Sequence, residues 1–297
     1  MPYLKRNDAS VFFDDTGGRG EAIVTLHDFI ENGSYWGRTG VSGALANVGY
    51  RVIDMDMRGH GRSVPEGANP GYSIESVAAD IGALADLLGL QRFHLLTHAT
   101  GGMAALRYAM DHSERLLSIT SSDTSSATIP LDKYCGPEWD ERLVPMDDPD
   151  ILSVAEYNTG MLAAFPNFAE MFRRLREDPA NHPLAPFYNR FDSNSDPERC
   201  WRWALEIQSL NNPVLCSTFA RSYYADHDPR TAALRRIGCP NLVIVGEHDV
   251  YMVKPAEQLA RCIPQAELVV MEGLGHMTAI EAPERITELV LRFLHST

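Results

Sequence analysis

The sequence predicts an α/β fold, a mostly parallel and doubly wound sheet with an inserted helical cap. Short apolar runs alternate with helical stretches before residue 124 and again after residue 237. Strands that alternate with helices form parallel sheets with right-handed crossovers. Between these parts the pattern is helical and irregular, with many prolines, aromatic residues and methionines. We therefore expect a core formed by residues 1–124 and 237–297, and a cap formed by residues 125–236.

The expected core strands are apolar runs bounded by turn residues. Residues 22–27 are continuously apolar up to His27, as is typical of a strand buried on both faces of a parallel sheet. Ser73 is a good N-cap for the helix that follows it. The strands are expected at residues 10–15, 22–27, 50–56, 92–96, 116–120, 240–246 and 266–271. The core helices are expected at residues 35–48, 73–88, 103–112, 255–262 and 282–295.

Composition and net charge limit the classes of binding partner that we expect. The chain has 297 residues and a formal net charge of −14, which disfavours nucleic acid and anionic membranes as partners. No apolar run approaches the roughly 18 residues of a membrane helix. No secretory h-region follows Met1, so we expect a cytoplasmic protein. Five cysteines without a C-x-x-C motif predict free thiols in a reducing compartment, with no metal or cofactor. The oligomeric state is left open.

A strand-to-helix turn at residues 97–102 is the most informative stretch. Its frame Thr97-x-Ala99-x-Gly101 has the spacing of a nucleophile elbow, G-x-S-x-G, in which a strained turn exposes the central side chain above the sheet. Here alanine occupies the nucleophile position, and a methyl group cannot attack a substrate. The neighbouring Thr100 is not expected to replace the nucleophile, because the elbow directs position 99, not position 100, at the histidine. His98 is expected to be structural.

Two further polar residues follow strands. Asp249 follows the strand at residues 240–246, and His276 follows the strand at residues 266–271. Ligands of parallel sheets bind beyond the carboxyl ends of the strands, where these residues would meet Ala99. An aspartate beside a histidine orients the imidazole and stabilises its protonated form. Asp123, which follows another strand, is an alternative acid.

The sequence resembles the α/β-hydrolase fold superfamily, and the resemblance spans nearly the whole chain outside the cap. It is carried by five segments that look like the family's oxyanion loop, D-x-R-G-x-G-x-S loop, elbow, acid motif and histidine motif. These are residues 27–29 with Trp36, 54–63, 97–102, 246–249 and 275–284. The fold hosts many reactions, so these motifs are more specific for the fold than for the chemistry.

The resemblance assigns roles to individual residues. It implies that His276 is the general base, that Asp249 orients it, and that the backbone N–H groups of Phe29 and Thr100 form the oxyanion hole. Three positions depart from the family pattern. Ala99 removes the nucleophile, Thr97 replaces a glycine, and Asp28 replaces the glycine of the oxyanion loop with a carboxylate. The carboxylate of Asp28 would lie near a site meant for negative charge.

We interpret the chain as a hydrolase of the esterase or lactonase type, acting on a carboxylic ester or lactone of a largely apolar small molecule bound between cap and core. In this interpretation Ala99 stands where a parent Ser-His-Asp enzyme has serine, and the chain is an inactive serine-to-alanine variant of that enzyme. One alternative is a natural enzyme that uses the His276–Asp249 pair as general base for water-mediated hydrolysis, lyase or cyclase chemistry. The other is a non-enzymatic receptor for a small ligand.

Overall fold

The structure, a computed structural model, describes residues 2–66, 72–127, 160, 164–182, 184–224, 226 and 230–297. Its strands form a single sheet in the order β1-β2-β4-β3-β6-β7-β8-β9, and β5 pairs with β2. The strands are β1 (Tyr3–Lys5), β2 (Ala9–Asp15), β3 (Ala22–Leu26), β4 (Arg51–Met55), β5 (Val64–Pro65), β6 (Phe93–His98), β7 (Leu116–Ser122), β8 (Asn241–Gly246) and β9 (Ala266–Met271).

The sheet is mostly parallel, as the sequence predicts. β2 pairs antiparallel with β1, β4 and β5, whereas every neighbouring pair from β4 to β9 is parallel. β6 lies between β3 and β7, and all of its residues are buried. The carboxyl ends of these central strands therefore form one edge, at which the loops after them meet.

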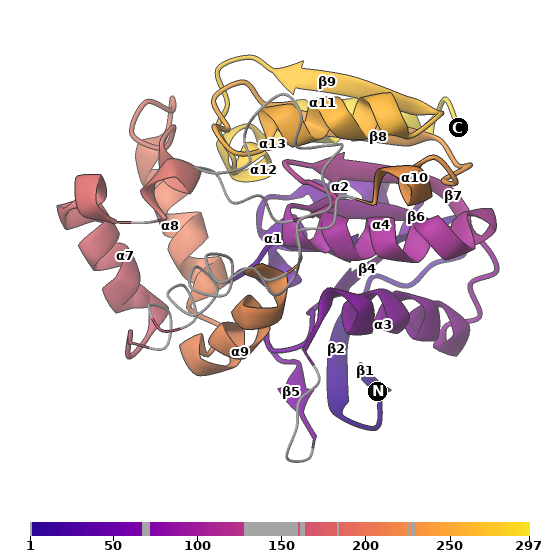
Figure 1. Cartoon of the computed structure of the whole chain (residues 1–297), viewed down its shortest axis with the longest axis horizontal. Helices are drawn as coiled ribbons and strands as arrows, with labels where there is room; N and C mark the ends of the chain where they lie inside the picture. Colours follow the sequence, from indigo (N-terminus) through magenta and orange to yellow (C-terminus); the bar gives the residue numbers. More distant parts are fainter. Residues whose placement is uncertain are drawn as a thin grey trace.

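Helices cover both faces of the sheet. α3 packs on α4 over one face, and α2 packs on α13. Figure 1 shows α3, α4 and α11 in front of the strands. The core helices are α1 (Ser34–Arg38), α2 (Val41–Asn47), α3 (Ile74–Leu87), α4 (Thr100–His112), η1 (Ser113–Arg115), α11 (Val253–Cys262), α12 (Thr278–Glu281) and α13 (Pro283–Leu294).

The segment between β7 and β8 contributes helices and no strand in its described part. α7, α8 and α9 lie to one side of the sheet (Figure 1). The amide of Asn211 donates to the backbone oxygen of Glu31 at 3.0 Å, which ties this segment to the loop after β3. Its elements are α7 (Phe168–Glu177), η3 (Pro179–Asn181), η4 (Ala185–Tyr188), α8 (Pro197–Gln208), α9 (Pro213–Tyr224) and α10 (Thr231–Leu234). Much of the predicted cap, including residues 128–159, lies outside the described residues.

Two sequence-based expectations were wrong in detail. The helix predicted at residues 35–48 is two short helices, because Gly40 between α1 and α2 adopts a left-handed φ of 83°. The short antiparallel strands β1 and β5 were not predicted. Strands of three and two residues are too short to show an alternation of apolar and polar residues. Four cysteines are free and buried, and Cys135 lies outside the described residues.

Candidate active site

Ala99 lies in the turn between β6 and α4 with φ 42° and ψ −110°. A non-glycine residue rarely adopts a positive φ, and such a conformation stores about 1–3 kcal/mol of strain. The turn is held by the N–H of Ala99, which donates to the oxygen of Ser122 at 2.8 Å, and by the N–H of Gly102, which donates to the oxygen of Ala99 at 2.8 Å. The strained geometry of an elbow is present although residue 99 has no nucleophilic atom.

Gly101 lets α4 start close to the end of β3. A Cβ atom added at Gly101 would lie 2.6 Å from the backbone oxygen of His27 and 2.7 Å from the Cβ atom of Leu26. Real Cβ atoms do not approach other atoms so closely, so only glycine fits at this position. The close approach brings Asp28, the residue after His27, beside the start of α4.

His276 and Asp249 form a buried pair. Their Nδ1 and Oδ2 atoms are 2.6 Å apart, and both residues are 1% exposed. The other oxygen of Asp249 accepts the backbone N–H groups of Tyr251 at 3.1 Å and Met252 at 3.2 Å, which fixes the carboxylate. The structure thus places these two residues in the relation that the sequence predicts.

Asp123, the alternative acid, is held by a different set of groups. Its Oδ1 atom accepts the N–H of Gly246 at 2.9 Å, and its Oδ2 atom accepts the hydroxyls of Ser122 and Thr278 at 2.6 Å each. Burial and the charge of Asp249 raise the pKa of Asp123 to about 6. The carboxylate bound to His276 Nδ1 is therefore that of Asp249, not that of Asp123.

Asp28 occupies the space between the elbow and the histidine. Its Oδ1 atom accepts the backbone N–H of Thr100 at 3.1 Å and the Thr100 hydroxyl at 2.9 Å. Its Oδ2 atom lies 3.4 Å from His276 Nε2, the nitrogen that would face a nucleophile. The N–H assigned to the oxyanion hole therefore already binds a carboxylate. The sequence showed that Asp28 breaks the family pattern, but not that it binds both Thr100 and His276.

The imidazole of His276 lies between two carboxylates. Burial alone would lower its pKa, but the charge and hydrogen bond of Asp249, joined by those of Asp28, raise the pKa well above 6.5. Burial alone would raise the pKa of Asp28, but the hydrogen bond and charge of His276 lower it to about 2. The charged forms of Asp28 and His276 therefore stabilise each other, which favours a carboxylate beside an imidazolium.

His98 and Glu31 form hydrogen bonds with the backbone of His276 and of Asp28, respectively. His98 Nδ1 is 3.0 Å from Glu31 Oε2, and His98 Nε2 donates to the backbone oxygen of His276 at 3.0 Å. The same Glu31 oxygen accepts the backbone N–H of Asp28 at 2.9 Å. Burial opposes protonation of His98, but Glu31 raises its pKa to about 9. Sequence reasoning missed Glu31, because its only signal was its place in the loop after β3.

A small cavity opens beside these residues. Its volume is about 30 Å³, and the charged groups at its wall are Asp28 and His276. A cavity of this size holds about one water molecule. The ring of Phe29, whose N–H the resemblance assigns to the oxyanion hole, stacks on Tyr223 with ring centres 5.9 Å apart. The remaining walls are apolar or aromatic: Ile30, Ala99, Leu184, Phe187, Tyr188, Met252 and Met277.

Two other kinds of site are absent from the described residues. No helix in this part of the chain is both long and apolar enough to cross a membrane. Within the same residues, no group of three or more histidine, cysteine, aspartate or glutamate side chains could hold a metal ion.

Comparison with known proteins shows which protein family the chain belongs to. The model of the alpha/beta hydrolase fold family matches residues 21–283, and the chain belongs to this family. A fluoroacetate dehalogenase from Burkholderia sp. is 41% identical over 112 residues, which are 36% of this chain and 35% of the relative. A putative carbamate hydrolase from Caulobacter sp. (strain K31) is 29% identical over 246 residues, 82% of this chain and 81% of the relative.

Among solved structures, a thermophilic esterase from Thermogutta terrifontis superposes with a TM-score of 0.69 at 26% identity. The superposition covers 97% of this chain and 94% of the esterase. The proteins similar in sequence include a dehalogenase, carbamate hydrolases and non-heme haloperoxidases, so the comparison supports the family more firmly than it supports one substrate.

Proposed function

We propose that this protein hydrolyses a carboxylic ester or lactone of a small, largely apolar molecule, and that it does so without a covalent acyl-enzyme. The observation that carries this proposal is the Asp28 carboxylate, which bridges Thr100 and His276 where a serine enzyme would hold its nucleophile and oxyanion. The similar carbamate hydrolase and esterase support hydrolytic chemistry. The apolar residues around the cavity support an apolar substrate. Because a cavity of about 30 Å³ holds only about one water molecule, binding of such a substrate requires the cavity to widen.

Asp28 and His276 have the opposed pKa shifts of a base and an acid. The pKa of Asp28 is lowered to about 2 and that of His276 is raised, so one is ionised and the other protonated at neutral pH. A water molecule in the cavity attacks the carbonyl carbon and gives its proton to Asp28 Oδ2. His276 Nε2 gives its proton to the leaving alkoxide. The proton on Asp28 then passes over 3.4 Å to His276, which restores both groups.

The interpretation as a serine enzyme inactivated by alanine at position 99 meets an obstacle in Asp28. A serine enzyme needs an open N–H donor at Thr100, because negative charge develops there in the tetrahedral intermediate. Here the N–H binds the carboxylate of Asp28, which would stay ionised during attack by a serine and repel that charge. A serine at position 99 would therefore be insufficient for acyl transfer. In the water mechanism, by contrast, Asp28 takes the proton of the attacking water and is neutral when the charge develops. The receptor alternative gives the buried charges of Asp28, His276 and Asp249 no role.

Three variants separate these possibilities: Ala99→Ser, Asp28→Gly and the double variant. We would assay each on aryl esters and lactones, and probe each with a fluorophosphonate that labels activated serines. We expect the unchanged protein to hydrolyse a substrate, Asp28→Gly to lose the activity, and Ala99→Ser to remain unlabelled. Labelling should require the double variant, in which Thr100 regains an open N–H.

Rapid labelling of Ala99→Ser alone, with at least a hundredfold gain in hydrolysis, would instead support a serine enzyme. If no variant hydrolyses any ester or lactone, while a small ligand raises the melting temperature, the protein is a receptor and the proposal fails.

A further inference from the structure

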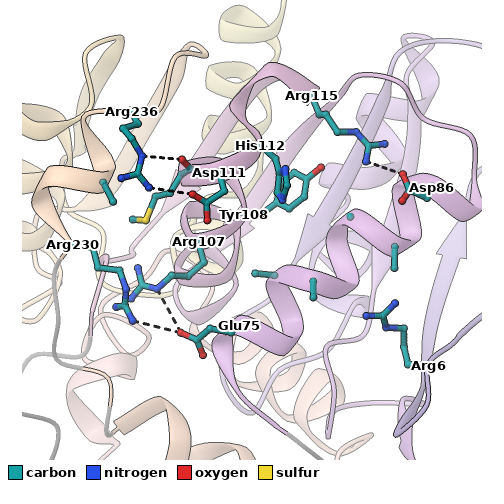
Figure 2. Close-up of a pocket in the computed structure, with 16 residues that line it drawn as sticks. Arg6, Glu75, Asp86, Arg107, Tyr108, Asp111, His112, Arg115, Arg230 and Arg236 are labelled. Carbon is teal, nitrogen blue, oxygen red and sulfur yellow. Dashed lines mark hydrogen bonds and ion pairs between the residues drawn. The ribbon is translucent and has the colours of Figure 1, made fainter.

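A second concave site lies between α3, α4 and α10 (Figure 2). Its volume is about 770 Å³, and it shares no lining residue with the cavity at Ala99. Five arginines line it, and each of them is ion-paired with a carboxylate in or beside the groove. The groove therefore concentrates guanidinium groups whose charges are paired, and an anion would bind there through the N–H groups that these carboxylates leave unused.

Arg107 is the buried cation of this groove. Only 8% of the residue is exposed. Its Nη2 atom donates to the backbone oxygen of Ser126 at 2.7 Å and to Asp226 Oδ2 at 2.8 Å. Its Nε and Nη1 atoms make no hydrogen bond to the residues that the structure describes. Buried donors without acceptors are unfavourable, and a bound oxyanion would satisfy them.

Glu75 lies where such an oxyanion would bind. Its Oε1 atom is 4.0 Å from Arg107 Nε and 3.5 Å from Arg230 Nη2, so it attracts both guanidinium groups without close contact (Figure 2). The Glu75 side chain is 61% exposed, so an anion from solvent would compete with it for the two arginines. Asp226 already binds Arg107 Nη2 and Arg230 Nη1 at 2.8 Å each, so a carboxylate or phosphate from solution would bind the N–H groups on the side that faces Glu75.

Tyr108 provides a second polar group and an aromatic wall. It is 4% exposed, and Arg115, another residue of the groove wall, interacts with its hydroxyl. The ring fits against α3 because residue 82 is glycine. A Cβ atom at Gly82 would lie 3.2 Å from Tyr108 Cε2. Beside the ring, the alanines at positions 78, 79 and 83 give the groove an apolar floor.

We propose that this groove binds a small organic anion with an apolar body. Arg107 and Arg230 hold its carboxylate or phosphate group, and the alanine floor beside Tyr108 contacts the body. The site takes no part in the reaction proposed above, so either proposal can fail without the other.

Calorimetric titration with phenyl phosphate, benzoate and inorganic phosphate tests this site. We expect saturable binding of an aromatic anion, with inorganic phosphate weaker because it lacks a body to cover the floor. The comparison of phenyl phosphate with benzoate tells which anionic group is preferred. Arg107→Gln should weaken binding about tenfold or more, since a charge-assisted hydrogen bond is lost. The matched control is Arg173→Gln, an exposed arginine of α7 that should leave binding unchanged.

Glu75→Gln keeps the test informative if Arg107→Gln does not fold. Removing the competing carboxylate should tighten binding severalfold, and a melting curve checks folding. Absence of saturable binding by both the unchanged protein and Glu75→Gln would overturn the proposal. So would equal affinity in Arg107→Gln, or weaker binding in Glu75→Gln. Equal affinity for phenyl phosphate and inorganic phosphate would overturn the assignment of the apolar floor.

Discussion

At the scale of single residues, Ala99 and Asp28 change the site together. Ala99 leaves no nucleophile in the elbow, and Asp28 binds the elbow's N–H donor and faces His276. Either change alone would spoil a serine enzyme. Both together place the His276 ring between two carboxylates, Asp28 and Asp249. This arrangement argues for a site built around a carboxylate rather than for one that has only lost a serine.

The pH dependence of turnover should show whether Asp28 is the general base and His276 the general acid, as we propose. Our mechanism needs ionised Asp28, whose pKa is about 2, and protonated His276, whose pKa lies well above 6.5. We therefore expect kcat to stay level from weakly acidic to neutral pH and to fall on the alkaline side as His276 loses its proton. Initial rates at saturating substrate, measured at several pH values over that range, give this dependence of kcat on pH. A kcat that rises through pH 6–7 would instead identify His276 as a general base.

The strain at Ala99 gives a stability prediction. Glycine adopts a positive φ without the steric penalty of a Cβ atom, so Ala99→Gly should stabilise the protein by about 1 kcal/mol. Urea denaturation measures this. The control is Ala104→Gly within α4, which should destabilise by about 1 kcal/mol or more because glycine is unfavourable inside a helix. Equal destabilisation by both variants would show that residue 99 is not strained.

At the scale of elements, the loops after β8 and β9 carry Asp249 and His276, and they touch. A Cβ atom at Gly246 would lie 2.0 Å from the backbone oxygen of Gly275. The contact places the acid loop against the histidine loop, so the 2.6 Å bond between the two side chains depends on a glycine at the end of β8.

Gly246→Ala should therefore separate these loops. We expect a loss of stability of about 1–3 kcal/mol from overpacking, together with a lower kcat. Gly238→Ala is the control, because the nearest atom to a Cβ there is 3.7 Å away. Denaturation and turnover are measured for both variants. If Gly246→Ala were as stable and as active as Gly238→Ala, the loop contact would not position the pair.

The sequence predicted the elements that carry strong patterns. Continuous apolar runs such as residues 22–27 located the parallel strands, and the glycines of the elbow located the turn at Ala99. The His276–Asp249 pair was predicted because both residues follow strands that end at one edge. Glu31 and the bridging position of Asp28 could not be predicted, since they depend on side-chain directions within an irregular loop. The left-handed conformation of Gly40, which separates α1 from α2, could not be predicted from the hydrophobic periodicity either.

At the scale of the whole molecule, the buried charges make stability depend on pH. The folded-state pKa of His276 is well above 6.5 and that of His98 is about 9. A histidine whose pKa is higher in the folded than in the unfolded state stabilises the folded protein. This contribution is complete at pH values below the unfolded pKa of about 6.5, and it is lost as the pH rises through the folded-state pKa. We therefore expect the free energy of unfolding to decrease between pH 6.5 and 9.

His98→Gln should make that decrease shallower. Each group that holds an extra proton in the folded state contributes up to about 1.4 kcal/mol per pH unit. Urea denaturation at several pH values gives the slope for the unchanged protein and the variant. An identical slope in both would mean that His98 is not held protonated by Glu31.

The arrangement of the chain places two concave sites on opposite ends of one helix. α4 begins at the elbow and ends beside the arginine groove, with Thr100 at one end and Arg107 to His112 near the other. The segment between β7 and β8 contributes to both, through Phe187 and Tyr188 at the small cavity and Arg230 at the groove. We propose that this insertion, predicted as residues 125–236, is the cap of the site.

The protonation state of His276 is the most direct test of the proposed site. Nitrogen-detected NMR of the imidazole, titrated in the unchanged protein and in Asp28→Asn, measures it. We expect both ring nitrogens to be protonated at neutral pH in the unchanged protein, with a pKa well above 6.5 that falls when the Asp28 charge is removed. A neutral His276 at pH 7, or a pKa that Asp28→Asn leaves unchanged, would contradict the proposed carboxylate–imidazolium–carboxylate site.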